Sequence, residues 1–305
     1  MGSLPADFKP IKDGAVTGRT LAERWILHKM NVAAKEINQG LADREFSRTT
    51  ISIYRYWYAE LCDVYIENSK AIIRDGTEEE RNSALQTLYT ALEGALVMIH
   101  PYMPFITEDM WQRMPRRPDD STKSIMVAKY TQYNPILDDP ESEAAYELVL
   151  GCVKGTRSLM AEYSLKEEAQ IKIHAYNDKS YQTCTEQLSS IKSLAGKGVN
   201  NVEIVGPNDP RPAGSVAYPV STSVAVFLYV KGRVDIDAEI AKAQKKLDKA
   251  TANAKRQEKI ILDPGYKEKV SPAVQESDAA KLAEVKQEAT SFQETIKQFE
   301  QLKVE

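Results

Sequence analysis

Apolar residues recur at helical spacing from residue 20 onward. Thr20 and Glu23 form a capping-box pattern, in which each side chain can satisfy a backbone N–H of the other residue, so a helix is predicted to begin here. Its apolar face has spacings of four, three and four positions and consists of Ile26, Met30, Ala33 and Ile37. Gly40 is expected to end this helix.

Two more long helices are predicted before residue 100. The first spans about 43–73 and is ended by Asp75-Gly76. Its apolar stripe consists of Ile53, Trp57, Leu61 and Val64. The second begins at another capping box, Thr77 to Glu80, and prolines stop it before a short helix that runs through Trp111. Its apolar face consists of Leu85, Leu88, Leu92, Leu96 and Ile99. Short loops between these helices predict an antiparallel bundle.

The pattern changes after about residue 118. Residues 119–139 are loop-like, and a helix is predicted over 140–163. Apolar and polar residues then alternate, with Ile171, Ile173 and Ala175 on one side and Lys172, His174 and Tyr176 on the other, which predicts a half-buried strand. The remaining elements are expected at 179–195 (helix), 202–205, 215–220 and 224–231 (strands). Because residues 224–230 are almost wholly apolar, the last strand is predicted to be central.

From residue 235 the chain is rich in Ala, Lys, Glu and Gln and has two heptad stretches. In the first, the apolar positions are Ile240, Leu247, Ala254 and Ile261, with Ala243, Ala250 and Gln257 three places after the first three of them. In the second, they are Leu282, Ala289 and Ile296, with Val285, Phe292 and Phe299 three places after them. The segment 263–272 contains Pro and Gly and cannot be helical throughout, so the two helices are expected to fold back as an antiparallel coiled-coil hairpin about 30 Å long.

The predicted fold is therefore mainly α, with three parts after an irregular lead-in over 1–18. A helical bundle is expected over 19–137, a small α+β linker domain over 138–232, and the antiparallel coiled-coil hairpin over 233–305. We call this last part the arm. A chain of 305 residues has room for two or three domains and at least one hydrophobic core.

Composition excludes several classes of protein. The net charge is −4, so any nucleic-acid-binding surface must be local. Cys62, Cys152 and Cys184 form no CxxC pair, which excludes a cysteine-based zinc site and favours a reducing compartment. No apolar run is long enough to span a bilayer, and the first residues do not resemble a basic presequence, so a cytoplasmic location is expected.

Catalytic chemistry has no signature in this chain. His28, His100 and His174 fall in three different predicted elements, and a structural role is expected for each. The Gly196-Lys-Gly198 segment lacks the flanking strand and Ser/Thr of a phosphate-binding loop. We expect no catalytic residue, no metal site and no cofactor within these residues.

Charge is distributed unevenly between the two arm helices. Residues 240–262 carry seven basic side chains and two acids, whereas residues 276–305 carry four basic side chains and seven acids. Two interpretations remain open: the basic helix pairs with the acidic helix across their flanks, or part of its basic face follows a phosphate backbone.

Aromatic residues surround a basic residue in the second predicted helix. In Ile53-Tyr-Arg-Tyr-Trp-Tyr58, Trp57 is expected to face the core. Tyr54, Arg55 and Tyr58 lie off the apolar stripe, and unpaired RNA bases stack on aromatic and Arg planes, so an RNA contact is a second interpretation for them.

Four longer segments resemble the C-terminal region of valyl-tRNA synthetases, class I enzymes, in their eukaryotic cytosolic form. They are Thr20-Leu-Ala-Glu-Arg-Trp-Ile-Leu-His-Lys-Met30, Trp57-Tyr-Ala-Glu-Leu-Cys-Asp-Val-Tyr-Ile-Glu67, His100-Pro-Tyr-Met-Pro-Phe-Ile-Thr-Glu-Asp-Met-Trp111 and Thr156-Arg-Ser-Leu-Met-Ala-Glu-Tyr163. The Lys/Glu hairpin separates this family from isoleucyl and leucyl relatives. The resemblance extends over nearly the whole chain from Arg19.

The resemblance implies tRNA(Val) as the partner, with the bundle reading the anticodon loop and the arm lying along the outer corner of the tRNA. The anticodon contacts are expected among polar or basic residues of the first two helices: Arg24, His28, Lys35, Arg48 and Arg55. The arm contacts are expected to be Lys242, Lys245, Lys246, Lys249, Arg256 and Lys259.

The parent enzymes use ATP and magnesium to attach valine to tRNA(Val), and they hydrolyse mischarged threonyl-tRNA in a separate domain. The catalytic and editing signatures do not occur in this chain. The family's bundle also has one helix before the position of Leu4, so a catalytic domain is expected upstream of Met1. Two alternatives remain: a free-standing coiled-coil interaction module, and the equivalent part of an isoleucyl or leucyl enzyme.

Overall fold

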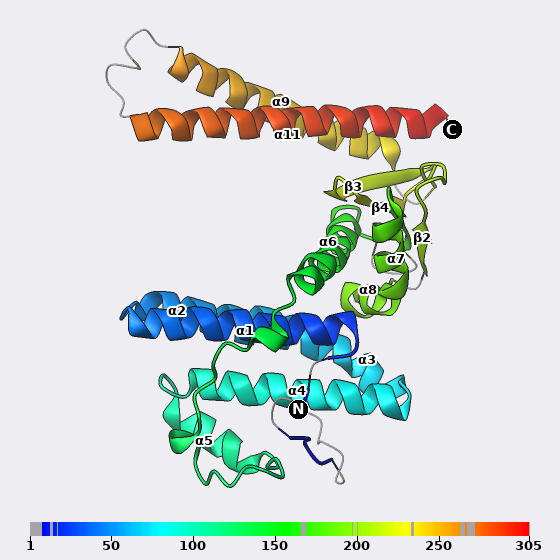
Figure 1. The fold of residues 1–305 in the computed structure, drawn as a ribbon. Coiled ribbons are helices and arrows are strands. Elements are labelled where there is room, and N and C mark those ends of the chain that lie inside the picture. The colour runs from blue at the N-terminus through cyan, green and yellow to red at the C-terminus, as the bar shows by residue number, and fades with distance from the viewer. Residues whose placement is uncertain are drawn as a thin grey trace. The chain divides into compact units, whose positions relative to one another are not determined.

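The computed structural model describes residues 8–12, 15–16, 18–165, 169–196, 198–199, 201–232, 235–262, 266 and 272–304, and most of them are helical (Figure 1). The chain divides into two compact units. The first comprises Met1–Val153 with Thr183–Lys197, and the second comprises Lys154–Gln182 with Gly198–Glu305. The three-part division predicted from the sequence stays a prediction.

The first helix, α1 (Leu21–Ala42), begins at the predicted capping box. Glu23 N–H donates to Thr20 Oγ1 at 3.3 Å, and Thr20 N–H donates to Glu23 Oε2 at 3.1 Å. All four residues of its predicted apolar face are buried. Gly40 does not end the helix, which corrects that prediction. It lies within the last turns, where a Cβ would meet the Thr49 hydroxyl at 2.6 Å, so its role is close helix packing.

The predicted helix over 43–73 is a continuous helical run with a different period in its middle. It comprises α2 (Phe46–Tyr54), the π-helical η1 (Arg55–Ile66) and α3 (Glu67–Asp75). The predicted stripe is wrong in part, because only Leu61 of its four residues is fully buried. The buried residues of this run are instead Thr49, Ser52, Tyr56, Glu60, Leu61, Tyr65, Asn68 and Ser69. Within the π-helical part, Tyr56 and Leu61 are five positions apart, and so are Glu60 and Tyr65. This wider spacing follows from the i→i+5 hydrogen bonds of a π-helix.

Helix α4 (Glu78–Ile99) begins at the predicted capping box of Thr77 and Glu80 and is followed by α5 (Pro104–Arg113). Its predicted apolar face is confirmed, with Leu88 half-buried and the other four residues buried. The loop that follows contains two 3-10 turns, η2 (Ile125–Val127) and η3 (Pro135–Leu137). A core cluster of Leu92, Leu96, Val97, Trp111 and Ile125 confirms the packed bundle. Trp57 packs against this cluster, as expected from the sequence.

The described residues of 140–229 contain three helices and a four-stranded mixed sheet. The strands are β1 (Gln170–Ala175), β2 (Asn201–Val205), β3 (Ser215–Ser221) and β4 (Val224–Tyr229), in the order β2-β1-β4-β3. Strand β1 pairs parallel with β2 and antiparallel with β4, so β4 is central as predicted. The helices are α6 (Pro140–Glu162), α7 (Asp178–Glu186) and α8 (Leu188–Ala195). The single helix predicted over 179–195 is therefore broken at Gln187.

His174 differs from the prediction that it lies on a polar strand face. It is only 5% exposed, because its ring packs against Tyr176 at 4.8 Å and Phe227 at 6.2 Å between ring centroids. Phe227 on β4 pairs with Lys172, which is two residues from His174 on β1. The side chains of Phe227 and His174 therefore lie on the same face of the sheet. The second face of this sheet is thus partly covered by aromatic side chains, which an alternation pattern within one strand does not reveal.

Helices α9 (Ile236–Ile261) and α11 (Pro272–Val304) pack antiparallel (Figure 1). Lys303 near the end of α11 pairs with Asp237 at the start of α9, and Lys286 Nζ lies 2.6 Å from Glu258 Oε1. The heptad positions of α9 are all buried or half-buried, which agrees with the predicted contact face. Most of the predicted turn at 263–272 lies outside the described residues, and supercoiling of the two helices stays a prediction.

Candidate nucleic-acid interface

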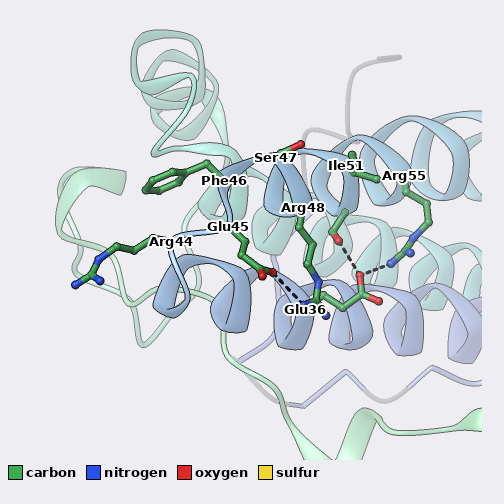
Figure 2. Close-up of a pocket in the computed structure, with 9 residues that line it drawn as sticks. Glu36, Arg44, Glu45, Phe46, Ser47, Arg48, Ile51 and Arg55 are labelled. Atoms are coloured by element: carbon green, nitrogen blue, oxygen red, sulfur yellow. Dashed lines mark hydrogen bonds and ion pairs between the residues drawn. The ribbon is translucent and has the colours of Figure 1, made fainter.

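An open hollow of about 800 Å³ lies at the turn between α1 and α2. Figure 2 shows the side chains around it, which come from the last turns of α1, the connecting turn and the first turns of the following helix. The lining residues are Glu36, Arg44, Glu45, Phe46, Ser47, Arg48, Ile51, Ser52 and Arg55. We call this feature the α1–α2 hollow.

Two of the three arginines in the α1–α2 hollow are held by carboxylates that also line it. Arg55 Nη2 lies 2.6 Å from Glu36 Oε2, and the same oxygen accepts a hydrogen bond from Ser52 Oγ at 2.7 Å. Arg48 Nη1 lies 3.2 Å from Glu45 Oε2. Arg44, whose φ of 60° lies in the left-handed region, makes no ion pair among the described residues and extends away from the helices (Figure 2).

Exposed apolar side chains flank these charges. Phe46 is 57% exposed, and Ile51, Tyr54 and Tyr58 are also exposed. The rings of Tyr54 and Tyr58 stack with centroids 5.3 Å apart and an interplanar angle of 12°. Ile51, Tyr54 and Tyr58 are spaced by three and four positions, so they lie on one side of the helical run. Because all three are exposed, this side faces solvent. Large exposed aromatic side chains of this kind commonly mark an interaction surface.

The α1–α2 hollow therefore combines three kinds of contact. The guanidinium groups are planar donors, the carboxylates and Ser47 are acceptors, and Phe46 offers an aromatic plane. Three cations next to two carboxylates leave little net charge with which to attract a phosphate backbone. Paired donors and acceptors instead suit the edges of unpaired bases, which stack on aromatic or Arg planes while their edges form hydrogen bonds.

The predicted anticodon contacts are distributed over a larger area than this hollow. Arg48 and Arg55 line it, whereas Arg24 lies about 18 Å from Glu36 along the α1 axis. Arg24 is exposed, and its Nε lies 3.1 Å from Asp139 Oδ2. Lys35 is also exposed, with Nζ 5.2 Å from the centre of the Tyr133 ring.

His28 is only 3% exposed and is held by acidic neighbours in the same unit. Asp139 N–H donates to its Nδ1 at 2.9 Å, so Nε2 carries the ring proton and donates to Glu143 Oε2 at 3.2 Å. The structure thus separates His28 from the exposed residues of the predicted set. Arg44 and Phe46 were missed by the sequence argument, although the Asp43-Arg-Glu45 turn between two helices was a signal that could have found them.

The second predicted surface lies on α9. Its buried side carries Ala243, Ala250 and Ala254. Five basic residues are exposed and make no ion pair in the described part of the chain: Lys245, Lys249, Lys255, Arg256 and Lys259. At 100° per residue, all five lie about 120° or more around the helix from the mean direction of the buried alanines. We call Lys245, Lys249, Lys255, Arg256 and Lys259 the outer basic face.

Two predicted arm residues have neighbours within the same unit. Lys242 pairs with Glu239 on its own helix, and Lys246 Nζ lies 3.6 Å from Glu162 Oε1 and 5.8 Å from the centre of the Phe292 ring. The described ion pairs that join the two arm helices use lysines of α11 and acids of α9. The described contacts leave both interpretations of the charge asymmetry open.

Metal and membrane sites have no counterpart in the described ranges. Within them, no group of three or more His, Cys, Asp or Glu side chains is placed to hold a metal ion. No described helix combines the length and hydropathy that a bilayer span requires.

Comparison with known families matches residues 23–175 to the anticodon-binding domain of tRNA ligases. This match covers half of the chain and includes the whole α1–α2 hollow, so the chain belongs to this family. It is a class of RNA-binding domain found in enzymes that join amino acids to tRNA.

The similar curated proteins are valine–tRNA ligases. A mitochondrial valine–tRNA ligase of Saccharomyces cerevisiae is 40% identical over 99% of this chain and 27% of its own length. The Rattus norvegicus valine–tRNA ligase is 32% identical over 93% of this chain and 22% of its own length. A valine–tRNA ligase of Symbiobacterium thermophilum is 29% identical over 92% of this chain and 33% of its own length. The chain spans between about a fifth and a third of the length of these relatives, which include mitochondrial and bacterial proteins as well as a mammalian one.

Proposed function

We propose that this chain is the tRNA(Val)-binding portion of a valine–tRNA ligase whose full-length form attaches valine to tRNA(Val) using ATP and magnesium. The observation that carries the proposal is the 40% identity to a valine–tRNA ligase over 99% of the chain, which includes the bundle, the α+β part and the arm. The partner on the protein side is the catalytic domain of the same enzyme. The eukaryotic cytosolic form and a cytoplasmic location belong to this proposal, and three free cysteines support a reducing compartment.

The α1–α2 hollow is proposed to read bases of the anticodon loop. Arg48 and Arg55 would donate to base edges, with Phe46 as a stacking plane and Arg44 as a free guanidinium. Arg24 and Lys35 are exposed on α1 and are proposed to contact phosphates near the loop. His28 is buried, so its proposed contribution is indirect, through Glu143.

The arm is proposed to be a coiled-coil hairpin that holds the tRNA backbone. Its outer basic face has no internal partners in the described residues, which supports a phosphate contact. Lys242 and Lys246 are proposed to add to this contact, although both have neighbours within the arm or next to it. No cofactor is proposed for this chain itself.

Direct binding measurements test the proposal. We expect the 305-residue chain to bind a transcript of tRNA(Val) at low salt and to prefer it over tRNA for isoleucine and for leucine. Affinity should fall steeply as salt rises, because each phosphate contact releases condensed counterions. Absence of tRNA affinity at low salt contradicts the proposal and favours a free-standing protein-interaction module. Stronger binding of the isoleucine or leucine tRNA would assign the chain to the corresponding enzyme.

A further inference from the structure

Arg55 of the α1–α2 hollow is connected to a partly buried cluster of charges behind it. Its Nε lies 3.6 Å from Glu60 Oε1, while its Nη2 contacts Glu36. Glu60 Oε1 in turn lies 3.0 Å from Lys29 Nζ, and Lys29 Nζ lies 2.8 Å from Glu143 Oε1. One continuous series of ion pairs therefore runs from the exposed hollow to the first turns of α6.

The π-helical segment explains why Glu60 faces inward. Tyr56 and Leu61 are buried on the same side of η1, and the wide turn brings Glu60 to that side as well. Glu60 is 7% exposed, and its Oε2 has no hydrogen-bond partner among the described residues. A buried carboxylate oxygen without a partner is costly when it is ionised, so burial at this position favours the neutral, protonated carboxyl.

The cluster contains more acids than bases. Three carboxylates, those of Glu36, Glu60 and Glu143, face two cations, Lys29 and Arg55. His28 lies beside the cluster, where its Nδ1 accepts the Asp139 N–H and its Nε2 lies 3.2 Å from Glu143 Oε2. The hydroxyl of Tyr56 donates to the Ala91 carbonyl at 3.1 Å and remains neutral.

The pKa values of Glu60 and Glu143 are shifted in opposite directions. Burial raises the pKa of Glu60, and the nearby Lys29 and Arg55 charges oppose that rise. The hydrogen bond from Lys29 is the main cause that lowers the pKa of Glu143. When a nucleic acid takes over Arg55 as a partner, Glu60 loses one of the two cations that favour its ionised form.

We propose that Glu60 is a positioning residue for Arg55 and that the cluster takes up one proton, on Glu60, when Arg55 engages RNA. The inference rests on the proposed RNA-binding function of the hollow. A proton from solvent adds to the free Oε2 of Glu60, and the guanidinium exchanges part of its carboxylate contact for an RNA acceptor. Charge balances, since the added proton replaces the positive charge of Arg55 in the cluster: three carboxylates facing two cations become two carboxylates facing one.

The sign of the pH effect follows from linkage. The complex binds one more proton than the free chain, so affinity rises as pH falls, by at most about tenfold per pH unit. We expect a severalfold gain in affinity for a tRNA(Val) transcript between pH 7.5 and pH 6.0 at constant ionic strength. Glu60→Gln, which cannot take up the proton, should bind with a nearly flat pH profile.

Three further variants of the 305-residue chain sharpen the test. Arg55→Gln removes the contact that transmits the effect and should also flatten the profile. Glu45→Gln removes an exposed carboxylate of the same hollow that pairs with Arg48 outside the buried cluster, so it should keep the wild-type slope. Glu60→Asp keeps a carboxylate and should restore part of the slope. Thermal unfolding of each variant establishes that it is folded.

The outcomes distinguish proton uptake on Glu60 from RNA binding by the hollow. A folded Glu60→Gln variant that retains the wild-type pH slope overturns this inference and leaves RNA binding intact. Loss of the slope in Glu45→Gln to the same extent as in Glu60→Gln also overturns it. If Glu60→Gln does not fold, the Arg55→Gln profile decides, and an unchanged slope there contradicts the inference. Failure of the wild-type chain to bind RNA overturns both this inference and the proposed function.

Discussion

The α1–α2 hollow and the outer basic face of α9 both carry basic residues, but their charges are arranged differently. In the hollow, Arg48 and Arg55 are paired with Glu45 and Glu36, and an exposed aromatic side chain lies beside them. On α9, the basic residues of the outer face are exposed and have no partner in the described part of the chain. Both surfaces belong to one net-acidic protein.

Under the proposed function, this difference predicts two kinds of nucleic-acid contact. A guanidinium that already has a carboxylate partner gains little from a phosphate, but it can exchange that partner for a base edge of the right geometry. Unpaired lysines gain affinity from any closely spaced phosphates and contribute little sequence information. The bundle is thus suited to discrimination between tRNAs, and the arm to salt-sensitive affinity.

The largest expected effect is loss of affinity when charge is reversed on the arm. Lys245→Glu combined with Lys249→Glu should weaken tRNA binding by roughly tenfold to a hundredfold near physiological salt and should lower the log–log salt slope by about two. The matched control is Lys281→Glu with Lys297→Glu on α11, which makes the same change of charge on the acidic helix. Equal losses in both double mutants would show that net charge, and not the outer basic face, determines affinity.

Substitutions in the α1–α2 hollow are expected to have a smaller effect, which reduces discrimination between tRNAs and not overall affinity. Arg48→Ala should reduce the preference for tRNA(Val) over a transcript with an altered anticodon by about 1–3 kcal/mol, with a nearly unchanged salt slope. Arg113→Ala is the control, because this exposed arginine also pairs with a neighbour on its own helix, Asp109, but lies outside the hollow. A preserved preference in Arg48→Ala would remove this residue from base recognition.

Stability should respond to acid in the bundle. Glu143 has a lowered pKa, chiefly because Lys29 donates a hydrogen bond to it, so its contribution is present above the unfolded pKa and is lost as pH falls through the folded one. Glu143→Gln should lower the free energy of unfolding by about 1–3 kcal/mol at pH 7, and the gap from wild type should close below about pH 4.5. Denaturant titrations from pH 7 to pH 3 measure this difference in the free energy of unfolding, and Glu141→Gln on the same helix is the control. A gap that is independent of pH would contradict the role of the Lys29 contact.

The smallest effect is expected for the stability of the arm. Lys249→Ala should change the free energy of unfolding by less than about 0.5 kcal/mol, because the side chain is exposed and has no ion pair among the described residues, while the salt slope of tRNA binding falls by about one. Lys246→Ala is the contrasting variant, since Lys246 contacts Glu162 and Phe292. Stability loss in Lys249→Ala that matches Lys246→Ala would mean that the outer face is structural.

Local sequence signals predicted much of this fold. Both capping boxes, the apolar faces of α1 and α4 and the central strand β4 are confirmed, because each depends on residues close together in the chain. The stripe in the second helix was wrong in part, since a 3.6-residue period was applied to residues that form a π-helix. That change of period places Tyr56 and Tyr65 in the core and leaves Trp57 half-buried.

The candidate sites were predicted less completely, for a different reason. His28 is separated by 115 positions from Glu143, its hydrogen-bond partner, and Arg24 is equally far from Asp139. Such contacts depend on how distant segments pack and leave no local pattern. The arm was simpler, because exposure of its lysines follows from the heptad period alone.

The central claim is that the bundle supplies discrimination and the arm supplies affinity for the same tRNA. Its most direct test is a salt titration of binding to two transcripts, tRNA(Val) and the same tRNA with an altered anticodon. The account predicts that both affinities fall steeply and in parallel as salt rises from about 50 mM to about 200 mM, because phosphate contacts weaken over this range. The ratio between the two affinities should therefore stay nearly constant. Equal affinity for the two transcripts at every salt concentration would contradict it.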